Sequence, residues 1–331
     1  MRLLTIGLPV HNAMPYLPEA VSSLLRQTYE DFELFVIDDG STDGSLGYLK
    51  TVRDRRLRLV TQESRGLTAT LNRMLAETST PWLVRHDADD VAFPERLLLT
   101  VNHIRRSPQA GMFYSYARHY YQGRTFGNFR STTAGPEQLR TLTQQGYLLA
   151  ICHPTVTLNV AKAVALGGYR FDLHVEDIDL WWRMALAHEI HLVPAFTVAF
   201  RQNAGSVSTN NFERQCTNTI FIQYLLLSHL WGLQPLPYSA VYEHLRLLLD
   251  HRRMHFRQHA RLANICLGQQ RHLHAVAHAS AALLASPEHV ARRVLHEFSP
   301  KAPVTNGEDP KRFLEQTALL WPGAAVECGV S

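Results

Sequence analysis

Three carboxylates fall within four consecutive positions, Asp87 to Asp90, directly after the apolar run that begins at Trp82. Residues i and i+2 of an extended backbone point the same way, so Asp87 and Asp89 can face one cleft. Carboxylate oxygens suit Mg²⁺ and Mn²⁺, which keep positions open for phosphate oxygens. The pair therefore predicts a Mn²⁺ or Mg²⁺ site that would offset charge on a departing diphosphate. A solvated acidic turn before the next helix is an equally good interpretation of this cluster alone.

A second acidic cluster begins with Asp38 and Asp39, after the apolar run that starts at Phe32. A carboxylate at a strand end can accept a hydrogen bond from a ribose hydroxyl or a base N–H, as in dinucleotide sites. Ser41, Thr42 and Asp43 follow, and for these three, turn and helix-cap chemistry is the simpler interpretation. Asp38 lies inside the strand end, where that interpretation fits less well.

Glu176 and Asp177 open a segment whose later turns are apolar. Negative charge is favourable at a helix start, so capping explains them without any chemistry. The functional alternative makes Asp177 a general base, because a hydroxyl is a poor nucleophile until a positioned carboxylate takes its proton. Arg65, before Gly66 and a predicted helix that contains Asn72, could pair with phosphate or stack on a base. A solvated loop is the alternative for Arg65.

The elements that must position these residues alternate along the first third of the chain. Apolar strand patterns and helical patterns follow one another, with strands predicted at 3–9, 32–37, 57–61 and 82–86 and helices at 17–27, 44–52, 67–77 and 94–106. This order predicts an α/β fold with a parallel sheet covered on both faces. Each polar cluster follows a strand, and ligands bind at that edge of open α/β sheets.

The rest of the chain is less regular and then becomes helical. Strands are predicted at 112–116, 155–158 and 196–201, and helices at 178–187, 218–230, 239–255, 260–267, 272–285 and 289–298. Residues 299–310 are rich in Pro, Gly and polar side chains and predict a loop, and the last residues predict a frayed end.

Composition narrows the function classes. The chain has 331 residues, 46% of them apolar, and a formal net charge of +4, which is too weak to indicate nucleic acid but suits an anionic substrate or membrane surface. The cysteines, Cys152, Cys216, Cys266 and Cys328, are unclustered, as expected in a reducing compartment. The first apolar run stops at Pro9, too short for a signal core. No run approaches the roughly 20 apolar residues of a membrane span. We expect a soluble, cytoplasmic protein, with peripheral contact at the inner face of the membrane as an option.

Together, these clusters match a known family. The chain resembles the family 2 glycosyltransferases, inverting enzymes with a GT-A fold, from about residue 3 to residue 210. The matching runs are Ile6–Asn12, Phe35–Asp43, Arg65–Gly66 with Asn72, His86–Asp90, His153–Pro154, Gly167–Tyr169, Glu176–Arg183, and Phe200–Arg201 with Ser206–Ser208. The combination is specific, whereas each run alone is not.

The resemblance implies a GT-A domain over residues 1–210, with a nucleotide-binding part at about 1–110 and an acceptor-side part at about 111–210. Residues 211–331 would form a helical C-terminal region. The resemblance also implies that Asp87 and Asp89 bind the metal, that Asp177 is the base and that Glu176 lies on the acceptor side. The implied nucleotide-binding residues are Pro9, Asp38, Asp39, Arg65 and Asp87.

The implied reaction moves a sugar from a nucleotide-sugar, most simply a UDP-sugar, to a hydroxyl of a glycan or lipid-linked acceptor. Surface polysaccharide, lipopolysaccharide or another glycoconjugate would be the product. A nucleotidyltransferase would need basic residues after the first strand, and positions 11–15 have none. A non-catalytic nucleotide-sugar-binding protein would not need Asp177.

The C-terminal third carries many Arg and His residues. His251, His255 and His259 share one helical face, where they could bind a metal, although solvated histidine faces are commoner. Neighbouring arginines make this segment basic, namely Arg252, Arg253, Arg257 and Arg261. Basic amphipathic helices can rest on anionic lipid. A plain solvated helix or a face that packs on a partner subunit is an equally good interpretation.

Overall fold

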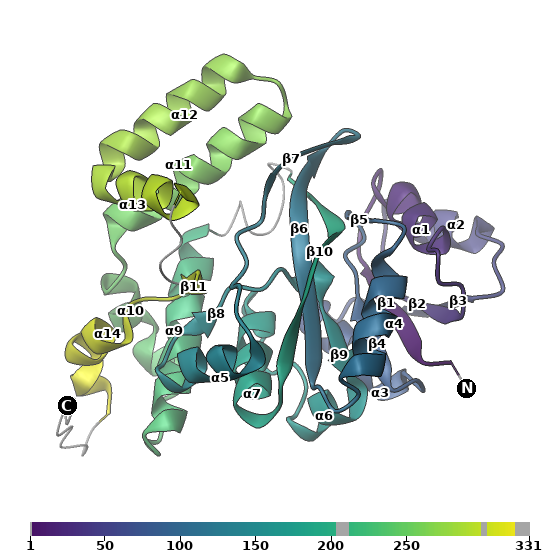
Figure 1. The fold of residues 1–331 in the computed structure, drawn as a ribbon, viewed down its shortest axis with the longest axis horizontal. Helices are drawn as coiled ribbons and strands as arrows, with labels where there is room; N and C mark the ends of the chain where they lie inside the picture. The colour runs from purple at the N-terminus through teal and green to yellow at the C-terminus, as the bar shows by residue number, and fades with distance from the viewer. Residues whose placement is uncertain (1, 203–211, 299–302, 322–331) are drawn as a thin grey trace.

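The computed structural model describes residues 2–202, 212–298 and 303–321 (Figure 1). Its nine central strands are β1 (Leu4–Val10), β2 (Phe32–Asp39), β3 (Leu57–Gln62), β4 (Trp82–Arg85), β5 (Val91–Ala92), β6 (Met112–Tyr121), β7 (Arg124–Asn128), β9 (Thr157–Asn159) and β10 (Ile190–Arg201). They form one sheet in the order β3-β2-β1-β4-β9-β6-β10-β5, and β7 pairs with β6. A second sheet pairs β8 (Leu148–Leu149) with β11 (Thr305–Asn306).

The predicted parallel arrangement holds for β3, β2, β1 and β4. Strand β9 runs antiparallel to both of its neighbours, β4 and β6, so the sheet as a whole is mixed. Because β9 is antiparallel to both of its neighbours, β6 runs parallel to β4. Strand β10 pairs in parallel with β6, so the carboxyl ends of β4, β6 and β10 meet at one edge of the sheet.

Each face of the sheet is covered because successive side chains of a strand point to opposite faces. Leu34 and Val36 of β2 join one buried cluster with α1 (Leu17–Leu25), α2 (Ser45–Thr51) and α4 (Arg96–Arg106). Phe35 and Ile37 join another with α3 (Leu67–Glu77), α5 (Pro136–Gln144), α6 (Val160–Ala165) and α7 (Glu176–Ala187). The fully buried strands explain the nearly continuous apolar runs of the sequence.

Helices dominate after residue 212: α9 (Phe212–Leu230), α10 (Tyr238–Leu247), α11 (His251–Gly268), α12 (His272–Ala285), α13 (Pro287–Phe298) and α14 (Pro310–Thr317). Helices α9, α10 and α14 share a buried cluster with Trp182 of α7. Helices α11 and α12 form a hairpin that lies toward the top of Figure 1. A side chain at Gly268 of α11 would collide with Phe126 of β7, so this hairpin rests closely on β7.

The expected order of strands and helices in residues 1–110 is confirmed, but one expectation for the tail is wrong. The helix predicted at 239–255 is two helices, because the Asp250 side chain accepts a hydrogen bond from the Arg253 N–H at 3.1 Å and starts α11 as an N-cap. Residues 310–320, for which the sequence predicted no element, form α14 and the short helix η2 (Ala318–Leu320).

Some expectations fall on residues that the structure does not describe. These are the proposed domain boundary at residue 210, the run Ser206–Ser208, Cys328 and the end of the chain beyond residue 321. Over the described ranges, no helix combines the length and hydropathy needed to cross a bilayer.

Candidate active site

The predicted site residues begin at one edge of the sheet. Strand β1 lies between β2 and β4, with Val10 opposite Asp38 and Gly7 opposite Arg85. Pro9 is buried in β1, two residues before the strand's loop. Neighbouring strands lie about 4.8 Å apart, so the ends of β2 and β4 are separated by only about 10 Å. The two acidic clusters therefore flank the end of the same central strand.

At the end of β2, the two aspartates differ in what they contact. Asp39 Oδ1 accepts hydrogen bonds from the Arg65 N–H (2.8 Å) and Gln62 Nε2 (2.6 Å), and Oδ2 accepts one from the Gly66 N–H (2.9 Å). This carboxylate therefore holds the loop before α3. Asp38 is 1% exposed, and its Oδ1 has no hydrogen-bond partner among the described residues. That oxygen is the acceptor at this strand end that remains available to a ligand.

The residues around these aspartates shape the loop. Arg65 is exposed, and its backbone, rather than its guanidinium, is what Asp39 holds. Gly66 follows with φ +85°, a left-handed conformation that favours glycine. Asp43 accepts hydrogen bonds from the Met14 N–H and from Ser45, which is the turn chemistry expected for that part of the cluster.

The acidic loop after β4 has one ion pair and two strongly perturbed carboxyls. Arg85 Nη2 donates to Asp87 Oδ1 at 2.5 Å. Burial and the nearby Asp87 charge raise the pKa of Asp89 to about 6. Burial, then the charges of Asp89 and Asp87, raise the pKa of Asp90 well above its usual range. The loop is therefore short of positive charge despite Arg85.

Two further buried arginines fix this loop. Arg96 of α4 donates at 2.6 Å to the carbonyl oxygens of both Arg85 and Pro154, which ties the end of β4 to the 3₁₀ turn η1 (His153–Thr155). Arg201, at the end of β10, donates its backbone N–H to Asp90 Oδ1 at 2.7 Å and its Nε to the Asp89 carbonyl at 2.6 Å. Segments far apart in the sequence are thereby held around the acidic loop.

Glu176 and Asp177 are adjacent buried carboxyls at the start of α7. Burial, then the Asp177 charge, raises the pKa of Glu176 to about 8. Burial raises the pKa of Asp177 to about 6, although the Ile178 N–H donates to its Oδ1 at 2.8 Å. His153 Nδ1 lies 3.9 Å from Glu176 Oε1 and 4.0 Å from Asp177 Oδ2. Burial and the Arg85 charge lower the pKa of His153 well below its usual range, so this imidazole is neutral near pH 7.

The loop after β4 and the start of α7 share one electrostatic environment. The Arg85 charge lowers, and the Asp87 charge raises, the pKa of both Glu176 and Asp177. Although burial opposes its charge, the Asp87 and Glu176 carboxylates raise the pKa of Arg85. Such mutual effects between buried groups require that they lie close together.

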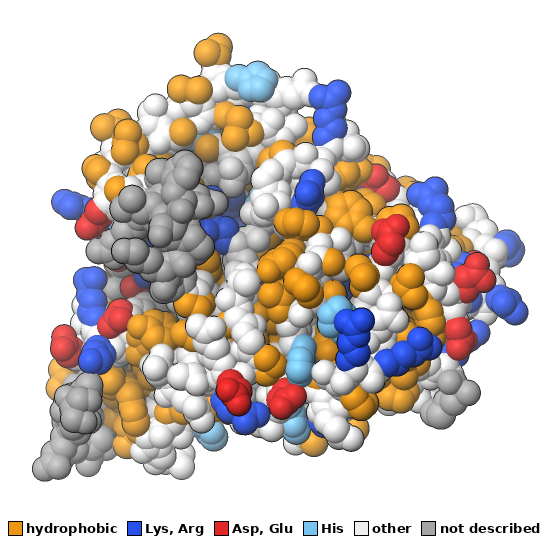
Figure 2. All heavy atoms as spheres, viewed as in Figure 1, with side chains coloured by type: hydrophobic (Ala, Val, Ile, Leu, Met, Phe, Trp, Pro, Cys, Tyr) orange, Lys and Arg blue, Asp and Glu red, His pale blue; other side chains and the backbone are white. Residues whose placement is uncertain are grey.

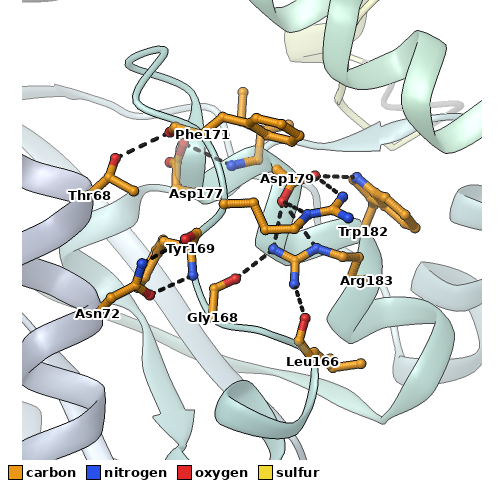
Figure 3. A network of polar contacts seen from close by, with 12 residues as sticks. Thr68, Asn72, Leu166, Gly168, Tyr169, Phe171, Asp177, Asp179, Trp182 and Arg183 are labelled. Carbon is orange, nitrogen blue, oxygen red and sulfur yellow. Dashed lines mark hydrogen bonds and ion pairs between the residues drawn. The ribbon is translucent and has the colours of Figure 1, made fainter. Parts of the chain in front are cut away.

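A buried carboxylate, Asp179, anchors this end of α7 (Figure 3). It is 0% exposed and accepts five hydrogen bonds, two from Arg170, two from Arg183 and one from Trp182 Nε1. Arg183 also donates to the carbonyl oxygens of Leu166 (2.6 Å) and Gly168 (2.7 Å). The network therefore fixes the loop before α7 and the turn that carries Asp177.

Asn72 attaches the same loop to α3 (Figure 3). Its Nδ2 donates to the Tyr169 carbonyl at 2.7 Å, and its Oδ1 accepts from the Tyr169 N–H at 2.9 Å. Gly168 has φ +60°, and a Cβ at this position would collide with Asn72 Oδ1. The Tyr169 hydroxyl lies 3.2 Å from His153 Nε2 and so links α3 to the carboxylate pair.

The structure thus brings Asp87, Asp89, Glu176 and Asp177 together, and places Asp38, Asp39 and Arg65 along the same edge beside them. Sequence reasoning missed Arg85 as a site residue. Its signal in the sequence was a charged residue directly after the apolar run Trp82–Val84, at the end of the strand. The anchoring role of Asp179 was also missed, although Trp182 and Arg183 follow it by three and four positions, a spacing that faces one side of a helix.

The acidic loop fits a divalent cation. Burial and then the Asp87 charge raise the pKa of Asp89, and a cation at this pair would offset both effects. No cluster of three or more Asp, Glu, His or Cys side chains in the described parts of the chain is arranged to hold a metal. A metal at this pair would therefore take its remaining ligands from water or substrate, as Mg²⁺ commonly does.

Comparison with known proteins identifies relatives by sequence. The model of the family described as Glycosyl transferase family 2 matches residues 5–165. The Bacillus subtilis (strain 168) protein EpsE is 30% identical over 53% of this chain and 63% of its own length. Two Haemophilus influenzae relatives are matched over only 36% and 42% of their lengths. The Escherichia coli protein WfgD, a UDP-Glc:alpha-D-GlcNAc-diphosphoundecaprenol beta-1,3-glucosyltransferase, is 25% identical over 64% of this chain and 81% of its own length.

Solved structures show the fold. The Staphylococcus aureus TarS fragment 1-349 in complex with UDP-GlcNAc superposes with a TM-score of 0.52 at 14% identity, over 88% of this chain and 92% of that one. The Pyrobaculum calidifontis mannosyltransferase PcManGT, in complex with GDP-Man and Mn²⁺, gives a TM-score of 0.51 at 18% identity, over 96% and 85%. The GT-A fold expected from the sequence is confirmed.

We predict that Asp179→Ala lowers the free energy of unfolding by about 3–5 kcal/mol, because it leaves the buried Arg183 guanidinium without its carboxylate. Urea unfolding followed by tryptophan fluorescence measures the loss. Glu189→Ala is the control: it removes a carboxylate that is 59% exposed in its ion pair with His191, and should cost less than about 0.5 kcal/mol. Equal midpoints for the two variants would contradict the anchoring role.

Proposed function

From the match of residues 5–165 to the model of glycosyl transferase family 2, we propose that the chain is an inverting glycosyltransferase. It would move a sugar from a nucleotide-sugar donor to an acceptor hydroxyl. One observation carries the proposal: Asp177 and Glu176, adjacent at the start of α7 and with pKa values of about 6 and about 8, share their electrostatic environment with the acidic loop after β4. This arrangement offers a base beside a site for a diphosphate.

The charge state of the pair supports a base role for Asp177. Near pH 7 its carboxylate is ionised, since its pKa is about 6, whereas Glu176 keeps its proton, since its pKa is about 8. Asp177 Oδ1 is occupied by the Ile178 N–H, so Oδ2 is the oxygen left to accept a proton. A base whose pKa lies near the operating pH works best. A non-catalytic nucleotide-sugar-binding protein would have no use for this tuning.

The proposed step is one displacement. The acceptor hydroxyl oxygen attacks the anomeric carbon and forms the new glycosidic bond while its proton passes to Asp177 Oδ2. The bond between the anomeric carbon and the diphosphate oxygen breaks, and the nucleoside diphosphate leaves with the electron pair. Attack from the face opposite the leaving group inverts the anomeric configuration. Glu176, neutral and adjacent, would donate a hydrogen bond to the acceptor.

The nucleotide would lie along the ends of β1 and β2. Asp38 Oδ1, which has no hydrogen-bond partner among the described residues, suits a base N–H or a ribose hydroxyl, and Pro9 lies on the adjacent strand, opposite Ile37. Arg65, exposed on the loop that Asp39 holds, can reach a phosphate. Asp87 and Asp89 would hold Mn²⁺ or Mg²⁺, which supplies positive charge against the charge that develops on the departing diphosphate.

The relatives suggest the substrate class. The name of WfgD states a UDP-Glc donor and a diphosphoundecaprenol-linked acceptor, TarS is seen with UDP-GlcNAc, and PcManGT with GDP-Man and Mn²⁺. We propose a UDP-sugar donor and a glycan or lipid-linked acceptor, in the synthesis of a surface polysaccharide, lipopolysaccharide or related glycoconjugate. A cytoplasmic location fits a nucleotide-sugar donor.

We predict that Asp177→Asn lowers kcat at least about 100-fold, a typical contribution of a general base, while the Kd for UDP stays within a few-fold. Release of UDP from a panel of sugar nucleotides measures turnover, and calorimetry measures UDP binding. Asp31→Asn, at an exposed surface carboxylate, is the control and should leave both unchanged. Near-normal turnover of Asp177→Asn would remove Asp177 as the base.

The pH profile of turnover tests the charge states of Asp177 and Glu176. The active form has Asp177 ionised and Glu176 protonated, so kcat/KM should rise through about pH 6 and fall through about pH 8. The fall follows because a second negative charge repels the donor's diphosphate. Glu176→Gln cannot ionise, so it should keep the rise near pH 6 and lose the fall near pH 8. A profile of Glu176→Gln that is identical to the wild type would contradict this assignment.

Metal removal tests the acidic loop. We predict that EDTA abolishes turnover and that added Mn²⁺ restores it, because the repulsion between Asp87 and Asp89 then has its counter-charge. A direct titration of Mn²⁺ by electron paramagnetic resonance, with UDP present, should show binding in the wild type and loss of binding in Asp89→Asn. Full turnover in thoroughly chelated buffer would refute the metal role.

A further inference from the structure

Helix α12 has an apolar face on its outer side. Its sequence, HLHAVAHASAALLA, contains no Asp, Glu, Lys or Arg. Its buried residues are the small Ala275 and Ala282. Its large apolar side chains are exposed instead: Leu273 by 85%, Val276 by 64%, Leu283 by 49% and Leu284 by 83%. We call these four residues the α12 stripe.

The α12 stripe lies on one side of the helix. Positions 273, 276, 283 and 284 are separated by three, seven and one residues, and at 100° per residue they fall within about one quadrant. Ala275 and Ala282 lie on roughly the opposite side, against α11. Figure 2 shows orange side chains gathered over α12 at the top of the molecule. A helix that is apolar on both sides normally lies inside a protein or a bilayer interface.

The stripe sits at the same end of the molecule as the candidate active site. Strand β6 runs parallel to β4, so its carboxyl end lies at the edge that carries Asp87 and Asp89. The β6–β7 hairpin turns at that end, and α11 packs on β7 through Gly268 and Phe126. Figure 1 shows α12 beyond α11, farther from the sheet.

The surroundings of the stripe are basic. Residues 251–298, which contain α11 to α13, carry seven arginines, no lysine and no aspartate, and only two glutamates. Arg271 at the start of α12 is exposed, as are Arg252 and Arg257 of α11. An apolar stripe beside such an excess of positive charge complements a surface that offers acyl chains beneath negative headgroups.

We propose that the α12 stripe docks the protein on an anionic phospholipid surface, with the active-site edge of the sheet on the membrane side. A second copy of the chain fits less well. A helix of 14 residues is about 21 Å long, so its outer face offers about 200 Å², whereas a stable interface buries about 800 Å² on each partner. A membrane needs no matching surface, and a few inserted apolar side chains with basic neighbours suffice for reversible binding.

The sequence suggests lipid contact at the basic segment that forms α11, whereas the four exposed apolar side chains of the stripe lie on α12. Of the α11 histidines, His259 faces His278 of α12, with their Nδ1 atoms 3.1 Å apart, inside the hairpin. The use of docking for a lipid-linked acceptor rests on the proposed function, whereas docking itself does not.

Vesicle co-sedimentation of the full chain tests the proposal. Vesicles of phosphatidylglycerol with phosphatidylethanolamine should pellet the wild type, and vesicles of phosphatidylcholine alone should pellet at least about tenfold less. The double variant Leu273→Ser, Leu284→Ser should lose at least about tenfold of the binding to anionic vesicles. The matched control, Leu247→Ser, Leu319→Ser, changes two leucines that are 76% and 88% exposed on α10 and η2, and should bind as the wild type does.

Three outcomes would overturn the proposal. The first is a wild type that pellets with neither vesicle, and the second is equal loss in the two double variants. The third is self-association in analytical ultracentrifugation that needs Leu273 and Leu284 without vesicle binding, which would assign the stripe to a second copy. Circular dichroism melting verifies that both variants fold. Because pelleting requires neither donor nor acceptor, a chain that binds vesicles without transferring sugar would contradict only the proposed function.

Discussion

The geometry of the candidate site depends on a carboxylate that does no chemistry, Asp179. It is removed from water, where an unpaired charge would be very costly, and five hydrogen bonds from two guanidiniums and an indole offset that cost. Because the same arginine, Arg183, also holds two carbonyls of the preceding loop, the loop and the first turn of α7 form one rigid unit. Glu176 and Asp177 are carried on that unit, so their positions follow from an ion pair buried beneath them.

Within the site, burial and charge act in opposite directions, and their balance decides which acid is ionised. Burial is the largest effect on Asp89, Glu176 and Asp177 and raises all three pKa values. The Arg85 charge lowers each of them, but one guanidinium shared among several acids cannot neutralise them all. The pair at α7 therefore holds one proton near pH 7, and the loop after β4 keeps an excess of negative charge. A donor diphosphate, itself negative, could approach such a place only with a counter-ion.

The positions of the strand ends could be predicted from the sequence, but the side-chain contacts that fix them could not. Buried parallel strands read as apolar runs, so the positions of Asp38 and Asp87 at one sheet edge followed from β1, β2 and β4. The strand predicted at 155–158 forms as β9, but an apolar pattern does not encode strand direction, so its antiparallel pairing could not be predicted. Arg96 is buried through partners 10 to 58 residues away, contacts that no local spacing encodes. The break at Asp250 was missed because helical periodicity continues across it, and only the cap reveals it. The roles of the site residues remain predictions.

Strand β9 also joins the two halves of the sheet, β3-β2-β1-β4 and β6-β10-β5. It pairs with β4 at three positions and with β6 at two, far fewer than the seven that join β1 to β2. Arg96 reinforces the β4–β9 side of this junction, since its Nη2 donates to a carbonyl at the end of β4 and to one in η1, just before β9. Continuity between the two halves of the sheet thus relies on a side chain where a backbone ladder is thin. Main-chain pairing tolerates almost any substitution, whereas a contact made by one guanidinium is lost when that single residue is replaced, even if every strand still forms.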